Sequence, residues 1–236
     1  MYKILDAQTL ACSVHLFKIE APEVARKARA GQFIVLRIDE KGERIPLTLA
    51  NWDAGEGTVT VIFMEIGATT ARLGQLKKGD SIAKFTGPLG MPTEIEKFGN
   101  VICVGGGIGI APITPIARSL KEAGNNVISI MGARQKDLLF WEDELRRNSS
   151  ELIVCTDDGS YARKALVTEP LKELLSEGKI DRVIAIGPIP MMKFCSLTTK
   201  PFGVKTIVSL NPLMVDGTGM CGCCRVSVGD ATRFAC

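Results

Sequence analysis

The stretch Val101-Ile102-Cys103-Val104-Gly105-Gly106-Gly107-Ile108-Gly109-Ile110-Ala111-Pro112 decides the fold of the chain. Its first four residues are wholly apolar, which is typical of a strand buried on both faces of a parallel sheet. A glycine-rich turn follows, and residues 113–123 then show a helical pattern that ends at Gly124. A strand, a glycine turn and a helix, in this order, favour the binding of a nucleotide's phosphates. The turn lacks the last glycine of G-x-G-x-x-G, and no Lys-Ser/Thr pair follows it, so it is not a P-loop.

Apolar strands and helices alternate through the rest of this part of the chain. Strands are predicted at 126–131, 151–155, 182–186 and 205–210, and helices at 141–147, 166–177 and 191–197. This alternation predicts a doubly wound α/β domain with a parallel sheet. Ligands of such sheets bind beyond the carboxyl ends of the strands. Here those ends are rich in glycine or polar residues, at 105–111, 132–135, 156–160 and 187–191.

The first third of the chain lacks strong helical periodicity and contains short β-branched runs between turn signals. The runs are 11–19, 32–38, 58–64 and 81–85, and their spacing predicts a barrel or sandwich. Three segments are candidates for holding a ligand: 43–50, 62–70 and 86–90. In the second, Gly67, Thr69 and Thr70 offer amides and hydroxyls to an anion such as pyrophosphate. The plainer alternative is a strand end followed by a helix cap.

The composition of the chain limits the classes of protein to which it can belong. The chain has 236 residues, a net charge of +3, 46% hydrophobic residues and 23% charged residues, which is ordinary for a soluble globular protein. The small net charge and the lack of a basic run argue against a nucleic-acid partner. The N-terminus has no apolar signal region, and the uncharged run 101–117 contains four Gly and two Pro, so no membrane span is expected. Eight cysteines without a signal fit a reducing, cytoplasmic location.

Residues 213–236 hold four of the eight cysteines among several glycines. Cys221 and Cys224 have C-x2-C spacing, Cys236 follows at a distance, and Asp216 stands where an x4 spacing would place a first ligand. Plant-type [2Fe-2S] loops use C-x4-C-x2-C with a distant fourth cysteine. The working hypothesis is therefore a [2Fe-2S] cluster held by Asp216, Cys221, Cys224 and Cys236. A zinc knuckle, which also uses C-x2-C, and a coincidental cluster remain as alternatives.

The three parts together resemble the ferredoxin–NADP reductase superfamily, in which a flavin-binding barrel precedes a pyridine-nucleotide domain. The family's last strand commonly ends in C-G-P-x-x-M, which Gly187, Pro188 and Met191 match, with Ile186 in place of Cys. The family's flavin motif, R-x-Y-S or R-P-x-S, is matched by Pro46-Leu47-Thr48. Ile45 takes the place of the Arg, and Arg44 lies one residue earlier.

The C-terminal loop narrows the resemblance to one branch. This branch of the family contains the electron-transfer subunits of dihydroorotate dehydrogenase B and the small subunits of NADH-dependent ferredoxin:NADP oxidoreductase, also called sulfide dehydrogenase. Asp216 at the first ligand position resembles the second group and favours iron–sulfur over zinc. The resemblance implies a FAD-binding β-barrel at 1–97, a doubly wound NAD(P)-binding α/β domain at 98–210 and a [2Fe-2S] lobe at 211–236. It also implies NAD(H) as the nucleotide, with NADP(H) as the alternative.

The resemblance further implies the site residues and the partner. Hydride would pass from nicotinamide to flavin and single electrons to the cluster, so no side chain is expected to act as acid or base. The implied FAD-binding residues are Ile45, Pro46, Leu47, Thr48, Ile62, Phe63, Met64, Gly67, Thr69, Thr70 and Gly87. The implied NAD(P)-binding residues are Gly106, Gly107, Ile108, Gly109, Arg134, Asp157, Gly187 and Met191.

The implied partner is a larger iron–sulfur flavoprotein subunit, and ferredoxin through that complex, with no nucleic acid and no membrane. The alternatives are the dihydroorotate enzyme's subunit, a stand-alone ferredoxin–NAD(P) reductase, or a nucleotide-binding module with a zinc knuckle. Binding of the 2′-phosphate of NADP(H) would require a basic residue after the second strand of the α/β domain, where Arg134 lies.

Overall fold

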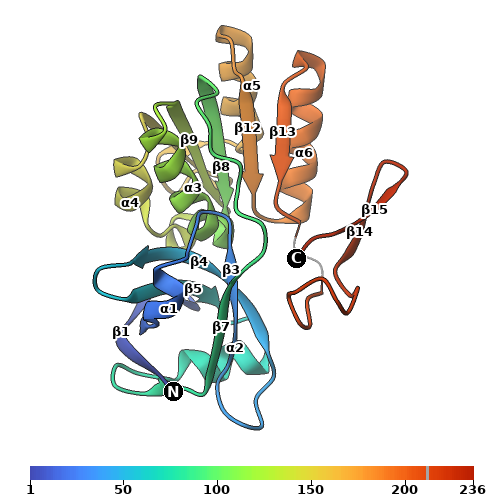
Figure 1. The fold of residues 1–236 in the computed structure, drawn as a ribbon. Coiled ribbons are helices and arrows are strands. Elements are labelled where there is room, and N and C mark those ends of the chain that lie inside the picture. The colour runs from blue at the N-terminus through green and yellow to red at the C-terminus, as the bar shows by residue number, and fades with distance from the viewer. Residues whose placement is uncertain (211–212) are drawn as a thin grey trace. The chain divides into compact units, whose positions relative to one another are not determined.

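The structure, a computed structural model, describes residues 1–210 and 213–236. The chain divides into two compact units (Figure 1). One unit comprises residues 1–93 together with 210–236, and the other comprises residues 94–209. The predicted architecture of a β-barrel, a doubly wound α/β domain and a small C-terminal lobe is confirmed.

The first unit is built on a seven-stranded antiparallel sheet with the order β6-β1-β2-β5-β4-β3-β7. Only Ala83 separates the two edge strands in the chain, so the edges are brought together and the sheet is nearly closed into a barrel. Its elements are β1 (Tyr2–Ala11), β2 (Val14–Glu20), α1 (Pro22–Ala25), β3 (Phe33–Arg37), β4 (Ile45–Asp53), β5 (Thr58–Met64), α2 (Ala68–Gly74), β6 (Ser81–Ile82) and β7 (Lys84–Leu89).

The barrel encloses an apolar core because alternate residues of each strand point inward. Phe17 on β2 and Phe63 on β5 are almost fully buried and meet edge to face, with ring centroids 5.1 Å apart. Leu36 and Leu49 are also fully buried in this core. Sequence analysis missed β1 as a separate strand, because its polar and charged residues interrupt the apolar run.

The second unit contains a six-stranded sheet with the order β11-β10-β9-β8-β12-β13, in which all paired strands are parallel. The strands are β8 (Asn100–Gly106), β9 (Asn126–Ala133), β10 (Glu151–Thr156), β11 (Arg163–Lys164), β12 (Arg182–Ile186) and β13 (Lys205–Val208). The helices are α3 (Ile110–Glu122), α4 (Glu142–Arg147), α5 (Thr168–Glu177) and α6 (Ile189–Thr199), and short 3₁₀ turns cover Gly107–Gly109, Lys136–Leu138 and Lys200–Phe202.

Both faces of the parallel sheet are covered by helices (Figure 1). Ile102 and Val104 of β8 share a buried cluster with residues of α5 and α6. Val101 and Cys103, which point to the opposite face, are also fully buried, and α3 packs against β8 there. Burial on both faces explains why the strands read as continuous apolar runs.

The C-terminal segment of the first unit forms a two-stranded hairpin, β14 (Arg225–Val228) and β15 (Ala231–Phe234). Both strands are mainly exposed. Cys224, just before β14, is buried. Two-stranded hairpins are marginal alone. The loop before the hairpin packs against the barrel, since a Cβ added at Gly217 would lie 3.0 Å from Phe33 of β3 and 3.2 Å from Leu89 of β7.

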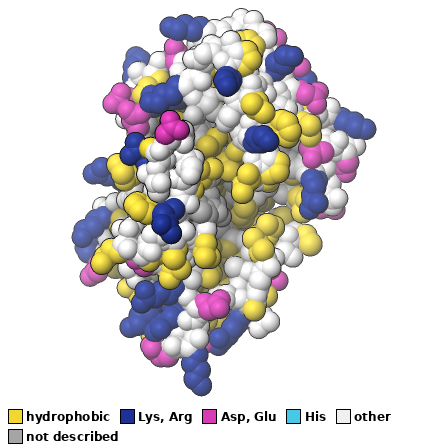
Figure 2. All heavy atoms as spheres, turned by 90° about the vertical axis from the view of Figure 1, so that its right-hand side faces the viewer, with side chains coloured by type: hydrophobic (Ala, Val, Ile, Leu, Met, Phe, Trp, Pro, Cys, Tyr) yellow, Lys and Arg dark blue, Asp and Glu magenta, His cyan; other side chains and the backbone are white. Residues whose placement is uncertain are grey.

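Helix α6 exposes Ile189, Phe194 and Leu197, which are 51–69% accessible. Figure 2 shows the side of the molecule on which α6 lies, where patches of apolar side chains lie between basic ones. The sequence from 183 to 215 contains no Asp or Glu and three Lys. The outer surface of α6 is thus apolar with a basic margin.

Candidate functional site

The turn after β8 approaches the end of β12 so closely that it requires glycine. A Cβ added at Gly109 would overlap the carbonyl of Ile186, and one added at Gly105 would lie 2.8 Å from Ile113. Parallel pairing of Ile186 with Gly105 brings these two strand ends together. The close approach of backbone to backbone is the reason for the glycines that sequence analysis singled out.

Three predicted nucleotide residues, Gly106, Gly187 and Met191, meet at this edge. The Met191 thioether occupies the position that a Cβ at Gly106 would need, and a Cβ at Gly187 would lie 2.9 Å from the Gly106 carbonyl. Met191 is held there because α6 begins at Ile189, directly after the β12 turn. The C-G-P-x-x-M pattern therefore corresponds to a contact between the ends of β8 and β12.

Gly107 lies on the open side of the same turn. Its φ is +53°, and among the described residues no atom lies within 4 Å of an added Cβ. The 3₁₀ turn Gly107–Gly109 leads into α3, a helix of 13 residues, and Ile108 is half-buried beside it. Exposed backbone N–H groups before a long helix form an anion-binding position, and the helix dipole favours negative charge there.

Arg134 and Asp157 follow the neighbouring strands β9 and β10. Thr156 pairs with Ala133, and the next residues continue the contact: the Asp157 amide donates to the Ala133 carbonyl at 3.1 Å and the Asp158 amide donates to the Arg134 carbonyl at 3.2 Å. Arg134, the residue predicted to meet a 2′-phosphate, therefore lies within electrostatic reach of the Asp157 carboxylate, and its backbone is bonded to that of Asp158.

The two carboxylates differ electrostatically. Desolvation, followed by repulsion from Asp158, raises the pKa of Asp157, and the positive charge of Arg134 opposes that rise. The backbone amide of Ser160 donates to Asp158 at 2.9 Å and lowers the pKa of that carboxyl. Sequence analysis missed Asp158, although its place directly after Asp157 was the available signal.

The predicted flavin residues lie on adjacent strands of the barrel. Ile45, Pro46, Leu47 and Thr48 belong to β4 and Ile62, Phe63 and Met64 to β5. The strands are antiparallel and pair from Leu49 opposite Val61 onward, whereas 45–48 pair with β3 and 62–64 pair with β2. Ile45, Leu47 and Phe63 pack in or against the core, which leaves the backbone and the outward Thr48 for a ligand.

The hydroxyls of Thr69 and Thr70 already have partners. Thr70 Oγ1 accepts from the amides of Ile66 and Gly67 at 2.9 and 3.1 Å, so it caps α2. Thr69 Oγ1 donates to Glu43 at 2.9 Å. The capping alternative thus describes Thr70. Sequence analysis included Glu43 in the candidate segment 43–50 but missed its contact with Thr69. Gly67 is exposed, and no described atom lies within 4 Å of an added Cβ.

Gly87 lies on β7, whose residue Thr86 pairs with Val35 of β3. A Cβ at Gly87 would lie 2.6 Å from Ile34, a fully buried core residue. The absence of a side chain there is therefore required by the packing of β7 on β3.

The predicted cluster ligands lie in one lobe. Both carboxylate oxygens of Asp216 accept backbone hydrogen bonds, from Thr218 at 2.9 Å and from Cys221 at 3.1 Å. These bonds, led by that from Thr218, lower the pKa of Asp216, so it is an anion well below neutral pH. Asp216 therefore closes the loop that leads to Cys221.

Cys224 and Cys236 come together across the hairpin, with their Sγ atoms 3.0 Å apart. A hydrogen bond joins the two thiols, and it lowers the pKa of Cys224 and raises that of Cys236 to about 11. Within the described residues, no three His, Cys, Asp or Glu side chains are grouped tightly enough to hold a metal ion. The structure thus shows the four residues as two pairs, Asp216 with Cys221 and Cys224 with Cys236.

The donor set fits a [2Fe-2S] cluster in its chemistry. Three thiols and one carboxylate occur on two loops, and all eight cysteines of the chain are free. Gly217, Gly219 and Gly222 have positive φ values of 68–85°, which permit the tight turns that a cluster loop needs. Neighbouring Cys223 is exposed and is the fourth thiol of the lobe.

None of the helices within residues 1–210 and 213–236 is long and apolar enough to cross a membrane.

No protein-family model matches the chain. Several curated proteins do. The chain is 50% identical over 234 residues to the dihydroorotate dehydrogenase B (NAD(+)) electron transfer subunit homolog of Thermotoga maritima, and the match covers 99% of this chain and 83% of that protein. It is 32% identical to the dihydroorotate dehydrogenase B (NAD(+)) electron transfer subunit of Fusobacterium nucleatum, over 91% of this chain and 84% of that protein.

Solved structures agree with these relatives. A chain from the structure of NADH-dependent reduced ferredoxin-NADP oxidoreductase, a system of flavin-based electron bifurcation, superimposes with a TM-score of 0.95 at 49% identity. The match covers all of this chain and 85% of that one. Phthalate dioxygenase reductase, at 18% identity and a TM-score of 0.69, shares the fold.

The predicted resemblance is therefore confirmed: the relative at 50% identity is named as a homolog of the dihydroorotate dehydrogenase B electron transfer subunit and the relative at 32% identity as that subunit, and the two matches cover 99% and 91% of this chain. The chain belongs to the family of dihydroorotate dehydrogenase B electron transfer subunits and their homologues, and it is an electron-transfer subunit of an oxidoreductase.

Proposed function

We propose that this subunit takes electrons from NADH, passes them through FAD to a [2Fe-2S] cluster, and delivers them to a larger iron–sulfur flavoprotein subunit. When bound, the flavin and the nicotinamide supply the hydride chemistry and the cluster supplies one-electron transfer. The chain's own residues have to seat the nucleotide, seat the flavin and hold the cluster.

One observation carries the proposal. At the joined ends of β8 and β12, backbone from two strands meets at Gly109 and Ile186 while Gly107 stays open. This arrangement suits a pyrophosphate at Gly106–Gly109 and the start of α3. Gly187 and Met191, which contact Gly106, would then border the nicotinamide end of the nucleotide.

The nucleotide is proposed to be NAD(H). Arg134 is the basic group available to a 2′-phosphate, and Asp157 and Asp158 are bonded to the same strand end. A ribose with two hydroxyls can donate to carboxylates, whereas a 2′-phosphate would meet their repulsion.

The flavin is proposed to lie along the outward positions of β4 and β5. Thr48 and the backbone of 45–48 and 62–64 would contact it, with Gly67, Thr69 and Thr70 near its phosphates. Glu43 holds the Thr69 hydroxyl. A phosphate at Thr69 would therefore have to displace the Glu43 carboxylate. The backbone of Gly87 is also proposed to contact the flavin.

The cluster is proposed to be held by Asp216, Cys221, Cys224 and Cys236. Binding would draw together the two pairs that the lobe already forms and would expel the proton shared by Cys224 and Cys236. A charged carboxylate in place of one thiolate is a harder ligand, which would alter the reduction potential.

A protein partner fits the exposed apolar side chains of α6, because monomeric proteins rarely leave such groups adjacent. The proposed partner is the larger iron–sulfur flavoprotein subunit, with ferredoxin reached through the complex. The proposed location is the cytoplasm, supported by eight free thiols.

Anaerobic absorption spectroscopy tests the proposal. We expect the purified protein, reconstituted with FAD, iron and sulfide, to show flavin bands over broad iron–sulfur absorbance, and NADH to bleach both. A colourless protein that binds zinc in the tail and ignores NADH would refute it. Gel filtration with the co-expressed larger subunit tests the complex, and separate elution of two fully active proteins would contradict that part.

A further inference from the structure

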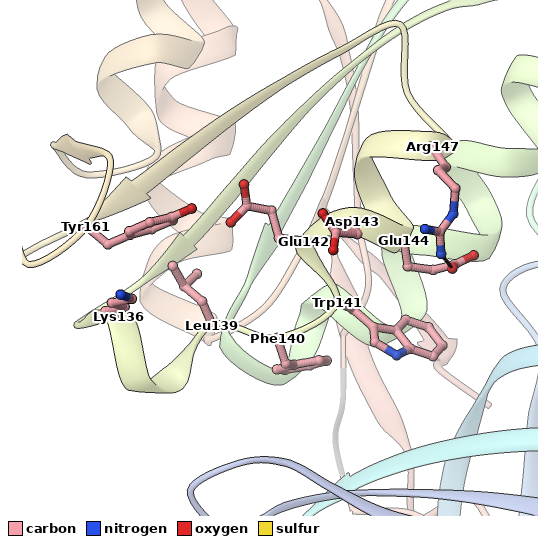
Figure 3. A pocket seen from close by; sticks show the side chains of 9 residues that line it. All are labelled: Lys136, Leu139, Phe140, Trp141, Glu142, Asp143, Glu144, Arg147 and Tyr161. Atoms are coloured by element: carbon pink, nitrogen blue, oxygen red, sulfur yellow. Dashed lines mark hydrogen bonds and ion pairs between the residues drawn. The ribbon is translucent and has the colours of Figure 1, made fainter.

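The second unit contains an open pocket of about 600 Å³ that none of the predicted site residues lines. Trp141 is among its lining residues, and Figure 3 shows Arg147 paired with Glu144 at one side of it. Glu142 is also paired, with Arg146 at 2.6 Å. Much of the charge around this pocket is therefore balanced by the chain's own side chains. A contact in the first unit has a more direct bearing on electron transfer.

Phe33 of β3 is the aromatic side chain against which the C-terminal lobe packs. A Cβ added at Gly217, the residue after Asp216, would lie 3.0 Å from Cε2 of the Phe33 ring. A Cβ added at Gly90, the residue after β7, would lie 2.8 Å from Cε1 of the same ring. Because Cε1 and Cε2 are on opposite edges of a phenyl ring, this half-buried ring lies between the two glycines.

Two further apolar side chains complete this surface. Val35 of β3 and Leu89 of β7 would each lie 3.2 Å from the Cβ added at Gly217. We call Phe33, Val35 and Leu89 the lobe seat. The φ of Gly217 is +74°, so a glycine at this position satisfies both the backbone conformation and the close approach to the seat.

The barrel side of the contact is fixed by hydrogen bonds. Phe33 pairs with Leu89 in the ladder between β3 and β7. Gln32, which is only 9% exposed, donates from Nε2 to the Gly90 carbonyl at 2.9 Å and accepts from the Arg29 amide at 3.0 Å. The Phe33 ring therefore stands on a part of the barrel that its neighbours hold in place.

The lobe side of the contact includes two of the proposed cluster ligands. Asp216 directly precedes Gly217, and the Cys236 carbonyl would lie 3.4 Å from the Cβ added at Gly90. The hydrogen bonds described above for Asp216 and Cys236 are made to residues of the lobe itself. Gly87, the proposed flavin contact on β7, precedes Gly90 by three residues, which span at most about 11 Å of chain. The seat thus joins the ligand-bearing loops to the strand that is proposed to contact the flavin.

We infer that Phe33 is a positioning residue: it seats the lobe on the barrel and so fixes the distance between the flavin and the [2Fe-2S] cluster. The inference rests on the proposed function, because it concerns the transfer of electrons from flavin to cluster. Each transfer oxidises the reduced flavin by one electron and reduces the cluster by one, and the proton released by the flavin passes to solvent. The rate of such a transfer falls steeply with the distance between the two centres, so a fixed seat keeps it fast.

Hydrogen exchange of the protein without iron tests the seat apart from any activity. The amides of Thr218 and Cys221 donate to Asp216, so their exchange reports how firmly the loop is held. In Phe33→Ala we expect this exchange to be about tenfold faster or more. Tyr2→Ala is the matched control, since Tyr2 is a partly buried ring of the same barrel that packs on Phe85, 5.4 Å away, and it should leave the loop unchanged. Unchanged exchange in Phe33→Ala would overturn the inference.

Kinetics of the protein reconstituted with FAD, iron and sulfide tests the consequence. After mixing with NADH, stopped-flow absorbance follows flavin reduction, and electron paramagnetic resonance of rapidly frozen samples follows cluster reduction. In Phe33→Ala, flavin reduction should keep its rate while cluster reduction becomes about tenfold slower or more, because the two centres are no longer held in position. Phe33→Leu keeps an apolar side chain and should restore most of the rate. Wild-type rates of cluster reduction in Phe33→Ala would overturn the inference.

Gly217→Ala tests the same contact from the side of the lobe and decides the matter if Phe33→Ala loads too little iron. Its methyl group would press on the Phe33 ring and should slow cluster reduction. Gly229→Ala is the matched control, because Gly229 also has a positive φ, +59°, but no described atom lies within 4 Å of an added Cβ. Equal rates of cluster reduction in these two variants would contradict the role of the seat.

These outcomes are distinct from a failure of the proposed function. Wild-type protein that transfers electrons from NADH to the cluster, together with unaffected Phe33 and Gly217 variants, would overturn the role of Phe33 alone. Wild-type protein whose flavin NADH does not reduce, or whose cluster stays oxidised when the flavin is reduced, would overturn the proposed function itself.

Discussion

The Sγ atoms of Cys224 and Cys236 lie 3.0 Å apart although eleven residues separate them in the chain. The antiparallel β14–β15 hairpin causes this proximity, because it pairs Arg225 with Phe234 and so returns the chain to its starting point. The pair forms a pre-arranged half of the proposed cluster site, which Cys221 and Asp216 would complete from the preceding loop.

Cys224→Ser and Cys236→Ser should each abolish cluster binding, because a serine hydroxyl, which stays protonated at neutral pH, does not replace a thiolate ligand of iron. Iron content and visible absorbance after anaerobic reconstitution measure the effect, and we expect less than about a tenth of the wild-type iron. Cys223→Ser is the control within the same loop and should retain the cluster. Loss of iron in the Cys223 variant with retention in the Cys224 variant would assign the ligands differently.

The tail shows what spacing can and cannot predict. The C-x2-C pattern and the position of Asp216 were sufficient to propose four ligands, because ligand spacing is local in sequence. The hairpin was not predicted, since β14 and β15 are short, largely exposed strands with little apolar alternation. The contact between Cys224 and Cys236 depends on that hairpin and could therefore only come from the structure.

Asp216→Cys should keep a [2Fe-2S] cluster and shift its reduction potential by on the order of 50 mV, equivalent to about 1 kcal/mol for one electron. The physical reason is the exchange of a hard carboxylate oxygen for a soft thiolate. Asp216→Asn keeps one oxygen able to accept the Thr218 amide but removes the charge, so it should load less iron. Redox titration followed by electron paramagnetic resonance measures both, and an unchanged potential in Asp216→Cys would argue against ligation.

Asp157→Asn combined with Asp158→Asn should improve kcat/KM for NADPH about tenfold, or ~1.4 kcal/mol, while changing that for NADH less. The Asp157 carboxylate interacts with the Arg134 charge and Asp158 follows it in the chain, so removing both charges would leave the guanidinium to a 2′-phosphate. Stopped-flow reduction of the flavin by each nucleotide provides the measurement.

Adding Arg134→Ala to the double variant is the control, and it should remove the gain with NADPH. A gain that persists without Arg134 would mean that the carboxylates act by simple repulsion alone. No gain in either variant would show that the ribose lies elsewhere.

This site also shows where sequence reasoning ends. Strand ends at 132–135 and 156–160 were predicted from apolar runs, and the parallel sheet places them together as expected. The pairing of Asp158 with the Arg134 backbone, and the pocket at Trp141, depend on how loops fold after the strands. Loops have no periodic apolar pattern, so the contacts that they make cannot be predicted from the periodicity of the sequence. For the same reason Glu43 was missed beside Thr69.

Gly109→Ala should destabilise the protein by about 1–3 kcal/mol, the range for forcing extra atoms into a packed site. The new methyl group would overlap the Ile186 carbonyl, and neither backbone can move without disturbing β8 or β12. Denaturant unfolding measures the change.

Gly107→Ala is the informative comparison. No described atom opposes its methyl group, so the folded protein should lose only about 1–2 kcal/mol from the left-handed backbone. The KM for NADH should nevertheless rise, because the methyl group would occupy the open position proposed for the pyrophosphate. Normal KM in Gly107→Ala would place the pyrophosphate elsewhere.

Arg182 ties the first residues of the second unit to its sheet. Its guanidinium donates to Glu94 at 2.7 Å and stacks 3.5 Å from the centroid of Phe98, and the residue is only 8% exposed. The hydrogen bond from Arg182 holds the pKa of Glu94 below its usual value of 4.5, with Lys205 adding a smaller attraction. The folded state therefore prefers the charged form of Glu94.

The sign of the pH effect follows from that shift. Because the folded-state pKa is the lower one, the stabilisation is complete above pH 4.5 and is lost as the pH falls through the lowered pKa. Glu94→Gln should thus lower the thermal midpoint at pH 7, and the difference from wild type should shrink toward pH 3. Glu96→Gln, an exposed neighbour in the same segment, is the control and should show no such convergence. A constant difference between Glu94→Gln and wild type at all pH values would mean that packing on Phe98, rather than charge, holds the segment.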